Sequence, residues 1–174
     1  MRRPLRLYRP FSVALALAVL ALALRPAAGP ARDNGLMEGE ENPRDTAVLD
    51  DVATTEVIGD VSTALARVFS YAPGDVAATE QAAGRELSGR ALDEYRRLFG
   101  QVRRQAPAQR VTLTTRVARA GVVSLTGDTA RLLVFLDQTA TRAGRPDGTP
   151  AAAQLMVTAH RDRGHWTINA LTSV

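Results

Sequence analysis

The spacing at which hydrophobic residues recur changes once along the chain, close to Pro107. This change limits the possible folds more than any other feature of the sequence. Before it, apolar residues recur with the spacing of an α-helix, as in Leu92, Tyr95 and Phe99. After it, apolar and polar residues alternate along residues 111–117, which is the period of a β-strand. Helices followed by strands are typical of an α+β domain.

Three helices are predicted. The first begins at Asn42-Pro43, and its packed face starts at Val57, while the apolar residues of the earlier turns fall off that face and indicate a solvated stalk. A shorter, Ala-rich helix follows over residues 76–87, and Ser88-Gly89 breaks it. The third helix is expected to end at Pro107, because proline interrupts helical hydrogen bonding.

The strands are expected to form an antiparallel meander. The strand over 128–142 starts with a nearly continuous apolar run, which is typical of a central strand, and a turn-rich loop is predicted over 143–150. The last two strands alternate around a hairpin turn at 161–164. The fold class is therefore α+β, with the helices packed on one face of a curved antiparallel sheet.

The N-terminus has the pattern of an export or membrane signal. Residues 1–10 are basic, and the apolar segment 11–26 contains an uncharged run over residues 11–24. Such a pattern predicts a cytoplasmic N-terminus, with the rest of the chain outside the cytoplasm. The run would span roughly 21 Å as a helix, less than the roughly 30 Å of a bilayer core, which favours a cleaved signal. Prolines near the small residues 27–31 disfavour cleavage, so a single-pass anchor and a secreted protein are both open.

Charge separates the export segment from the domain. Residues 1–32 carry six Arg and no acid, whereas residues 33–60 carry nine acids and one Arg. We interpret residues 27–44 as an acidic flexible linker and residues 45–174 as one domain. The chain has no Cys, which excludes disulfides, thiolate zinc sites and a Cys nucleophile.

Three stretches of the chain carry a family resemblance: VFSY at Val68 to Tyr71, the strand from Ala130 to Arg142, and Trp166 to Leu171. Together with the charged N-terminus, the apolar segment and the acidic stalk, they resemble the Mce-associated membrane proteins of actinobacteria. The resemblance implies a cone-shaped domain of the cystatin-like, nuclear transport factor 2-like (also SnoaL-like) type. It also implies an accessory role in envelope machines that move lipids or sterols, and it makes a homodimer through the open sheet face plausible.

Cones of this type often hold a pocket between the sheet and the helices. The candidate lining residues are Tyr71, Tyr95, Phe99, Phe135, Asp137, His160 and Trp166. Asp137 could orient His160 as a general base if the strand register brought the two together. The alternative is that both are partly exposed polar side chains and that Tyr71 and Tyr95 are core aromatics with their hydroxyls at the rim.

Two Arg pairs, Arg96-Arg97 and Arg103-Arg104, repeat at i,i+7 on the third predicted helix. They could contact anionic lipid headgroups or an acidic partner, and the alternative is a solvated helix face. Aromatic residues are 5% of the chain, too few for a nucleic-acid surface that interleaves them with Arg.

Catalytic and cofactor motifs are missing from the sequence. It contains no Gly-rich phosphate loop and no G-x-S-x-G elbow, and two His without Cys make no zinc site. We therefore expect no catalytic residue, cofactor or metal. We expect a non-enzymatic accessory protein of the cell envelope, held in the membrane by residues 11–24 and associated with Mce-type lipid or sterol transport proteins. The alternative is a secreted or anchored pocket protein for a small apolar ligand, with or without SnoaL-like catalysis.

Overall fold

The computed structural model describes residues 43–143 and 145–174. The predictions made for residues 1–10, for the apolar segment 11–26 and for most of the linker lie outside the described residues. Among the residues that are described, no helix is both long enough and apolar enough to cross a membrane.

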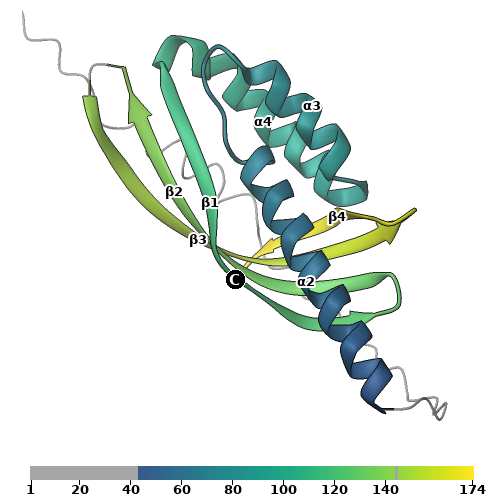
Figure 1. The fold of residues 1–174 in the computed structure, drawn as a ribbon. Coiled ribbons are helices and arrows are strands. Elements are labelled where there is room, and N and C mark those ends of the chain that lie inside the picture. The colour runs from purple at the N-terminus through teal and green to yellow at the C-terminus, as the bar shows by residue number, and fades with distance from the viewer. Residues whose placement is uncertain (1–42, 144) are drawn as a thin grey trace, which may run out of the picture.

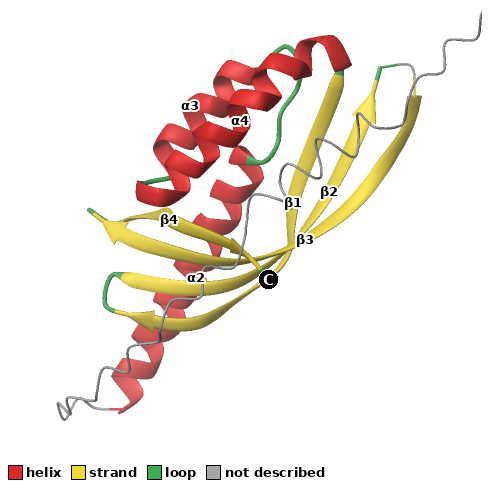
Figure 2. Cartoon of the chain, turned by 180° about the vertical axis from the view of Figure 1, so that it is seen from behind, coloured by secondary structure: helices red, strands yellow, loops and turns green. Residues whose placement is uncertain are grey.

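Three helices lie on one side of a sheet (Figures 1 and 2), as the sequence pattern predicts. They are α2 (Pro43–Val68), α3 (Val76–Glu86) and α4 (Gly89–Gln109). The packed part of α2 starts at Val57, which is fully buried, whereas Val52 one turn earlier is 63% exposed. The early part of α2 therefore projects past the core, as expected of a stalk.

Helix α4 ends later than predicted. The prediction that Pro107 ends the helix is wrong, because α4 continues to Gln109 and stops before Arg110, whose φ is 49°. Proline has no backbone N–H and therefore cannot donate the helical hydrogen bond at its own position. The residues that follow it in the last turn can still keep helical backbone angles. The left-handed Arg110 then turns the chain into the first strand.

Within the described residues, four strands form one antiparallel sheet in the order β1-β2-β3-β4. They are β1 (Val111–Thr126), β2 (Thr129–Arg142), β3 (Arg145–Asp162) and β4 (His165–Ser173). The predicted hairpin turn near residues 161–164 is confirmed, with Arg163 and Gly164 at φ 51° and 81°. The α+β class and the helix-on-sheet arrangement are likewise confirmed.

The loop predicted over residues 143–150 is mostly strand. Ala140 pairs with Thr149, and Thr139 pairs with Pro150, so β3 has already begun. The prediction was wrong because β4 joins β3 only from Leu155 onward, and the first part of β3 is therefore a sheet edge, where proline is tolerated. Gly148 suits this pairing because a Cβ there would collide with the methyl group of Thr139.

The sheet is strongly curved, as Figure 1 shows. The register of β1 against β2 shifts between Val117 and Arg119 and again between Val122 and Ser124, and β3 against β4 shifts between Thr158 and Ala159. Such bulges bend a strand and increase its twist. The curvature wraps the sheet around the packed half of α2.

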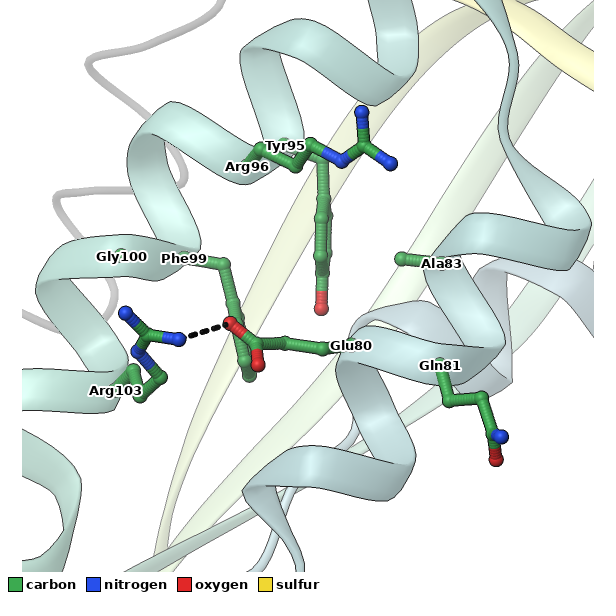
Figure 3. Close-up of a pocket in the computed structure, with 8 residues that line it drawn as sticks. All are labelled: Glu80, Gln81, Ala83, Tyr95, Arg96, Phe99, Gly100 and Arg103. Atoms are coloured by element: carbon green, nitrogen blue, oxygen red, sulfur yellow. Dashed lines mark ion pairs between the residues drawn. The ribbon is translucent and has the colours of Figure 1, made fainter.

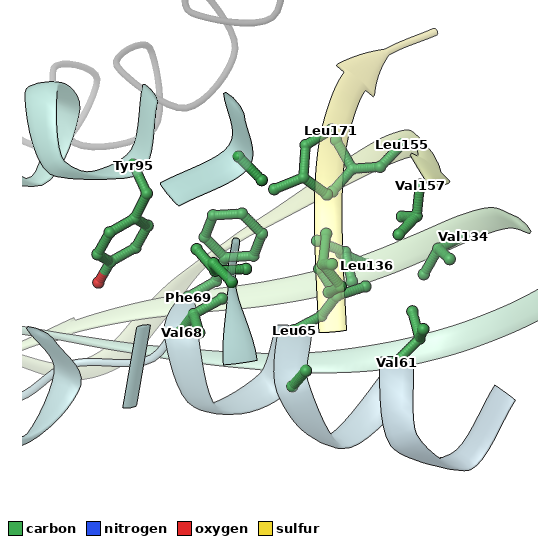
Figure 4. Packing of buried hydrophobic residues seen from close by; sticks show 14 of the residues in the cluster. Val61, Leu65, Val68, Phe69, Tyr95, Val134, Leu136, Leu155, Val157 and Leu171 are labelled. Atoms are coloured by element: carbon green, nitrogen blue, oxygen red, sulfur yellow. The ribbon is translucent and has the colours of Figure 1, made fainter. Parts of the chain in front are cut away.

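The core fills the space between α2 and the concave face of the sheet (Figure 4). Alternate residues of β2 point inward and are buried: Ala130, Leu132, Val134, Leu136, Gln138 and Ala140. From α2 the side chains of Val61, Leu65 and Val68 meet them, each at most 1% exposed. Aliphatic side chains thus occupy the interior in which a pocket was expected.

The connection after α2 is pinned to the sheet edge. The N–H of Tyr71 donates to the carbonyl oxygen of Leu113 at 2.9 Å, and the N–H of Leu113 donates back to Tyr71 at 2.9 Å. On the other edge, the N–H of Ser88 donates to the carbonyl of Ile168 at 2.8 Å. These backbone bonds fix where α3 and α4 begin and hence the position of the site between them.

Candidate functional site

A cleft of about 490 Å³ lies between α3 and α4, on the helical layer (Figure 3). Helix α3 lines it with Glu80, Gln81 and Ala83. Helix α4 lines it with Tyr95, Arg96, Phe99, Gly100 and Arg103. Its volume falls in the range of roughly 300–1,000 Å³ that small-molecule sites occupy.

Small residues on the facing helices leave this space open. Ala83 on α3 and Gly100 on α4 line the cleft without side chains long enough to cross it. A Cβ built on Gly100 would meet only the end of the Arg104 side chain, at 3.8 Å. The longer side chains of Tyr95, Phe99 and Glu80 therefore extend into the space between α3 and α4.

Aromatic rings form the inner wall of the cleft. The rings of Tyr95 and Phe99 stack with centroids 5.0 Å apart and an interplanar angle of 14°. Phe99 also meets the edge of Tyr71 at 6.2 Å and 80°, which joins the cleft wall to the core. Tyr95 is only 7% exposed, and its hydroxyl oxygen is buried without a hydrogen-bond partner.

The rim of the cleft is charged. A guanidinium nitrogen of Arg103 lies 3.5 Å from a carboxylate oxygen of Glu80, with the two side chains 62% and 39% exposed. Arg96, one residue after Tyr95, adds a second guanidinium group to the lining. Burial, and to a lesser degree the negative charge of Glu80, raises the pKa of the Tyr95 hydroxyl far above its usual range, so the phenol stays a proton donor.

The predicted pocket residues do not form one site. All four aromatic side chains are buried in the core, but only Tyr95 and Phe99 line the cleft, and Tyr71 and Trp166 do not. Burial also raises the pKa of Tyr71. Phe135 is 41% exposed, because its place in the β2 alternation puts it on the sheet face away from the buried side chains.

The expectation that Asp137 could orient His160 is wrong. Asp137 pairs in register with Ala152, while His160 pairs with Thr129, eight residues away along β2. At about 3.3 Å per residue the two positions are roughly 26 Å apart along the strand. Asp137 instead forms an exposed ion pair with Arg116 at 3.1 Å, and Nδ1 of His160 lies 3.4 Å from the hydroxyl of Thr129.

The two Arg pairs divide between two surfaces of α4. Arg96 and Arg103 line the cleft, while Arg97 and Arg104 are exposed and do not line it. Residues seven apart share a helix face, which explains this split. Sequence reasoning missed Glu80, Gln81, Ala83 and Gly100, because the Ala-rich α3 shows no functional pattern and only its packing beside α4 makes a cleft.

One further cluster of ionisable side chains in the described part of the chain is centred on Glu86. Among the residues that the structure describes, no group of three or more His, Asp or Glu side chains could hold a metal ion. Glu86 is buried and receives a hydrogen bond from Arg67 at 2.8 Å, with Nε2 of His165 at 3.8 Å from its other oxygen. This cluster ties α2 and α3 to the β3–β4 turn.

Comparison with known proteins finds relatives in Mycobacterium tuberculosis, while no family model matches the sequence. The "Outer membrane protein Rv1973" of strain H37Rv is 32% identical over 152 residues, which are 86% of this chain and 88% of that protein. The "Uncharacterized protein Rv1362c" is 31% identical over 135 residues, 77% of this chain. The match spans 61% of the length of Rv1362c.

Two solved structures share the fold. One is CagV, a VirB8 homologue of the type IV secretion system of Helicobacter pylori, with a TM-score of 0.55 and 11% identity over 70% of this chain and 98% of CagV. The other is an IcmL-like type IV secretion system protein from Legionella pneumophila, with a TM-score of 0.50 and 10% identity over 78% of this chain and 94% of that one. At this identity the likeness concerns the fold alone.

Proposed function

Because the chain belongs to the same family as the Outer membrane protein Rv1973 of M. tuberculosis, we propose that it is a non-enzymatic accessory protein of the cell envelope. In this proposal the domain lies outside the cytoplasm and docks onto subunits of a lipid- or sterol-transport assembly of the Mce type. The name of the relative supports the envelope location, and the basic N-terminus followed by an apolar run supports export.

The observation that carries the proposal is the packing of large apolar side chains between the helices and the sheet. The largest fully buried side chains, among them Trp166, Leu65 and Leu132, pack between the helices and the concave sheet face, where SnoaL-like enzymes would need a reaction chamber. The two His residues, His160 and His165, are exposed. A packed domain with charged outer faces suits a structural role better than turnover of a substrate.

The partner surface in this proposal is the exposed face of α4 that carries Arg97 and Arg104. Both guanidinium groups are outside the cleft, and within the described residues neither takes part in an ion pair. Arginine recognises carboxylates in a bidentate geometry, so an acidic patch on a transport subunit is the expected complement. A homodimer through the outer sheet face, where Phe135 is 41% exposed, stays a prediction.

The experiment is a crosslinked pull-down of the full-length chain from its native membranes, with N-terminal sequencing of the recovered protein. We expect the chain to fractionate with the envelope and to capture subunits of a lipid-transport complex. The double variant Arg97→Gln/Arg104→Gln should capture several times less of the same subunits.

The matched control removes two exposed Arg residues from the sheet instead, as Arg119→Gln/Arg131→Gln. It should capture the same subunits as the unmodified chain. Recovery of the protein without any transport subunit would contradict the proposal, and so would equal losses in both double variants. A mature N-terminus near Arg32 would assign the secreted form.

A further inference from the structure

The hydroxyl of Tyr95 is a buried polar group without a partner at the centre of the cleft. The side chain is 93% buried by area, since 7% is exposed, and Figure 3 shows its hydroxyl end directed from α4 toward α3. Buried hydroxyl groups in folded proteins are nearly always hydrogen-bonded, and an exception calls for a physical reason. A ligand that supplies an acceptor atom is such a reason.

The charges that line the cleft favour a negatively charged ligand. Arg96 and Arg103 contribute two positive charges to the lining, and Glu80 contributes one negative charge. A single negative charge on the ligand neutralises the remaining excess. The protonated phenol of Tyr95 acts as a donor, so it also favours an anionic oxygen over a cation.

The wall next to the hydroxyl is apolar. The Tyr95 and Phe99 rings stack at 5.0 Å and present ring surface to the cleft, with Ala83 on the facing helix. A purely inorganic anion would leave this surface without a partner. An anion attached to an apolar chain would cover it and gain from removal of the rings from water.

Glu80 reaches from the facing helix toward the hydroxyl end of Tyr95. Its side chain reaches from α3 toward Arg103, below the Tyr95 hydroxyl in Figure 3, and pairs with Arg103 at 3.5 Å. Both side chains are substantially exposed, at 39% and 62%. Exposed pairs of this kind contribute little to stability, so an incoming anion can take the place of the Glu80 carboxylate on Arg103.

We propose that the α3–α4 cleft binds a monoanionic amphiphile, with its acidic headgroup next to the Tyr95 hydroxyl and Arg103 and the start of its apolar chain against the Tyr95–Phe99 stack. The headgroup is a carboxylate, as in a fatty acid, or a phosphodiester, as in a lysophospholipid. Both are monoanionic oxygen acids on an apolar chain, and the experiment below distinguishes them. The inference goes beyond the proposed function, because it requires no partner subunit.

The test is photocrosslinking of the full-length chain in phosphatidylcholine nanodiscs. The probe is a fatty acid that carries a diazirine close to its carboxylate, and peptide mapping locates the crosslink. Competition with decanoate, with lysophosphatidylglycerol and with uncharged decyl maltoside compares headgroups on similar chains. We expect crosslinks on the peptides that contain residues 80–83 and 95–103, and we expect the two anions to compete and the maltoside not to.

Neighbouring residues supply matched variants. Tyr95→Phe and Arg103→Gln each remove one contact to the headgroup and should weaken competition by about tenfold or more, the loss typical of a charge-assisted hydrogen bond. Tyr71→Phe and Arg97→Gln remove the same groups outside the cleft and should leave competition unchanged. Glu80→Gln removes the competing carboxylate and should strengthen binding a few-fold.

The competition results distinguish a fatty acid from a phospholipid as the source of the headgroup. Stronger competition by decanoate assigns a fatty acid, and stronger competition by lysophosphatidylglycerol assigns a phospholipid, each in support of the site. Equal competition by decyl maltoside, crosslinks outside α3 and α4, or no difference between Tyr95→Phe and Tyr71→Phe would overturn the inference. Circular dichroism of each variant verifies that the loss does not come from unfolding.

Discussion

The side chain of Gln138 donates from Nε2 to the hydroxyl oxygen of Thr115 at 3.0 Å, and both residues are buried. Thr115 in turn donates to the carbonyl oxygen of Phe69 at 2.7 Å, and its backbone N–H donates to the hydroxyl of Ser70 at 2.9 Å. The chain just after α2 is thereby tied to two strands at once. These hydrogen bonds hold the backbone at Phe69 and Ser70, where the connection from α2 to α3 begins.

Replacement of Thr115 by Val should destabilise the domain. The substitution keeps the shape of the side chain but leaves the Gln138 amide and the Phe69 carbonyl without their partner, at a cost of about 1–3 kcal/mol. Urea unfolding of the full-length chain, followed by circular dichroism, measures the change. The control is Thr114→Val, which alters an exposed neighbour on β1 and should stay within about 0.5 kcal/mol of the unmodified chain. Coincident unfolding curves for the two variants would contradict the role of Thr115.

Replacement of Tyr95 by Phe should stabilise the ligand-free protein. The variant keeps the stacking on Phe99 and removes a buried hydroxyl that has no partner, so we expect a gain of about 1 kcal/mol. Thermal unfolding without added amphiphile measures it. A loss of stability would indicate that the hydroxyl has a partner in the free protein, and the argument for a ligand acceptor would fail with it.

Alkaline pH should weaken the fold partly through the same hydroxyl. Burial raises the pKa of Tyr95 in the folded protein above the usual value near 10. Above that value the unfolded chain loses this proton while the folded protein keeps it, so the unfolded state binds fewer protons and the free energy of unfolding falls as the pH rises. The contribution is complete below about pH 10 and is lost above it, with a limiting slope of about 1.4 kcal/mol per pH unit.

Urea unfolding at a series of pH values from about 9 to about 11 checks this slope. Tyr95→Phe should show a shallower fall than the unmodified chain, because only the contribution of Tyr71 and of the other titrating groups remains. Parallel curves for the two proteins would show that Tyr95 titrates normally.

Arg67→Gln should destabilise the junction of α2 with α3. Glu86 is 6% exposed and receives a hydrogen bond from Arg67 at 2.8 Å, so the variant leaves a buried carboxylate without its main cation. Because the Arg67 side chain is itself 61% exposed, we expect about 1–2 kcal/mol rather than the larger loss of a fully buried pair. Arg85→Gln, an exposed charge on α3 next to Glu86, is the control and should be neutral in the same unfolding measurement.

The local spacing of apolar residues was sufficient to predict most of the fold. The helical spacing from Val57 onward and the alternation along residues 111–117 identify buried faces, because burial of apolar side chains against one core imposes those periods. The pattern failed at residues 143–150, where Pro and Gly indicate a loop while the sheet accepts them in an edge segment of β3. Whether a strand segment lies at an edge depends on its neighbours.

The candidate site was predictable only in part. The aromatic and Arg positions on the third predicted helix made Tyr95, Phe99, Arg96 and Arg103 candidates, and all four line the cleft. Asp137 and His160 were candidates as well, but His160 pairs with a residue of β2 that lies eight positions away from Asp137. Register is a long-range property that a single strand does not encode.

The amino-acid sequence by itself determined the order of helices and strands and the buried faces of several of them, because these depend on the period and polarity of neighbouring residues. Tertiary structure alone decided which residues share a site. The distance between α3 and α4, the unpartnered Tyr95 hydroxyl and the division of four Arg residues between two surfaces arise when elements far apart in the chain pack together. Side-chain volumes on facing helices decide whether that packing leaves a cleft.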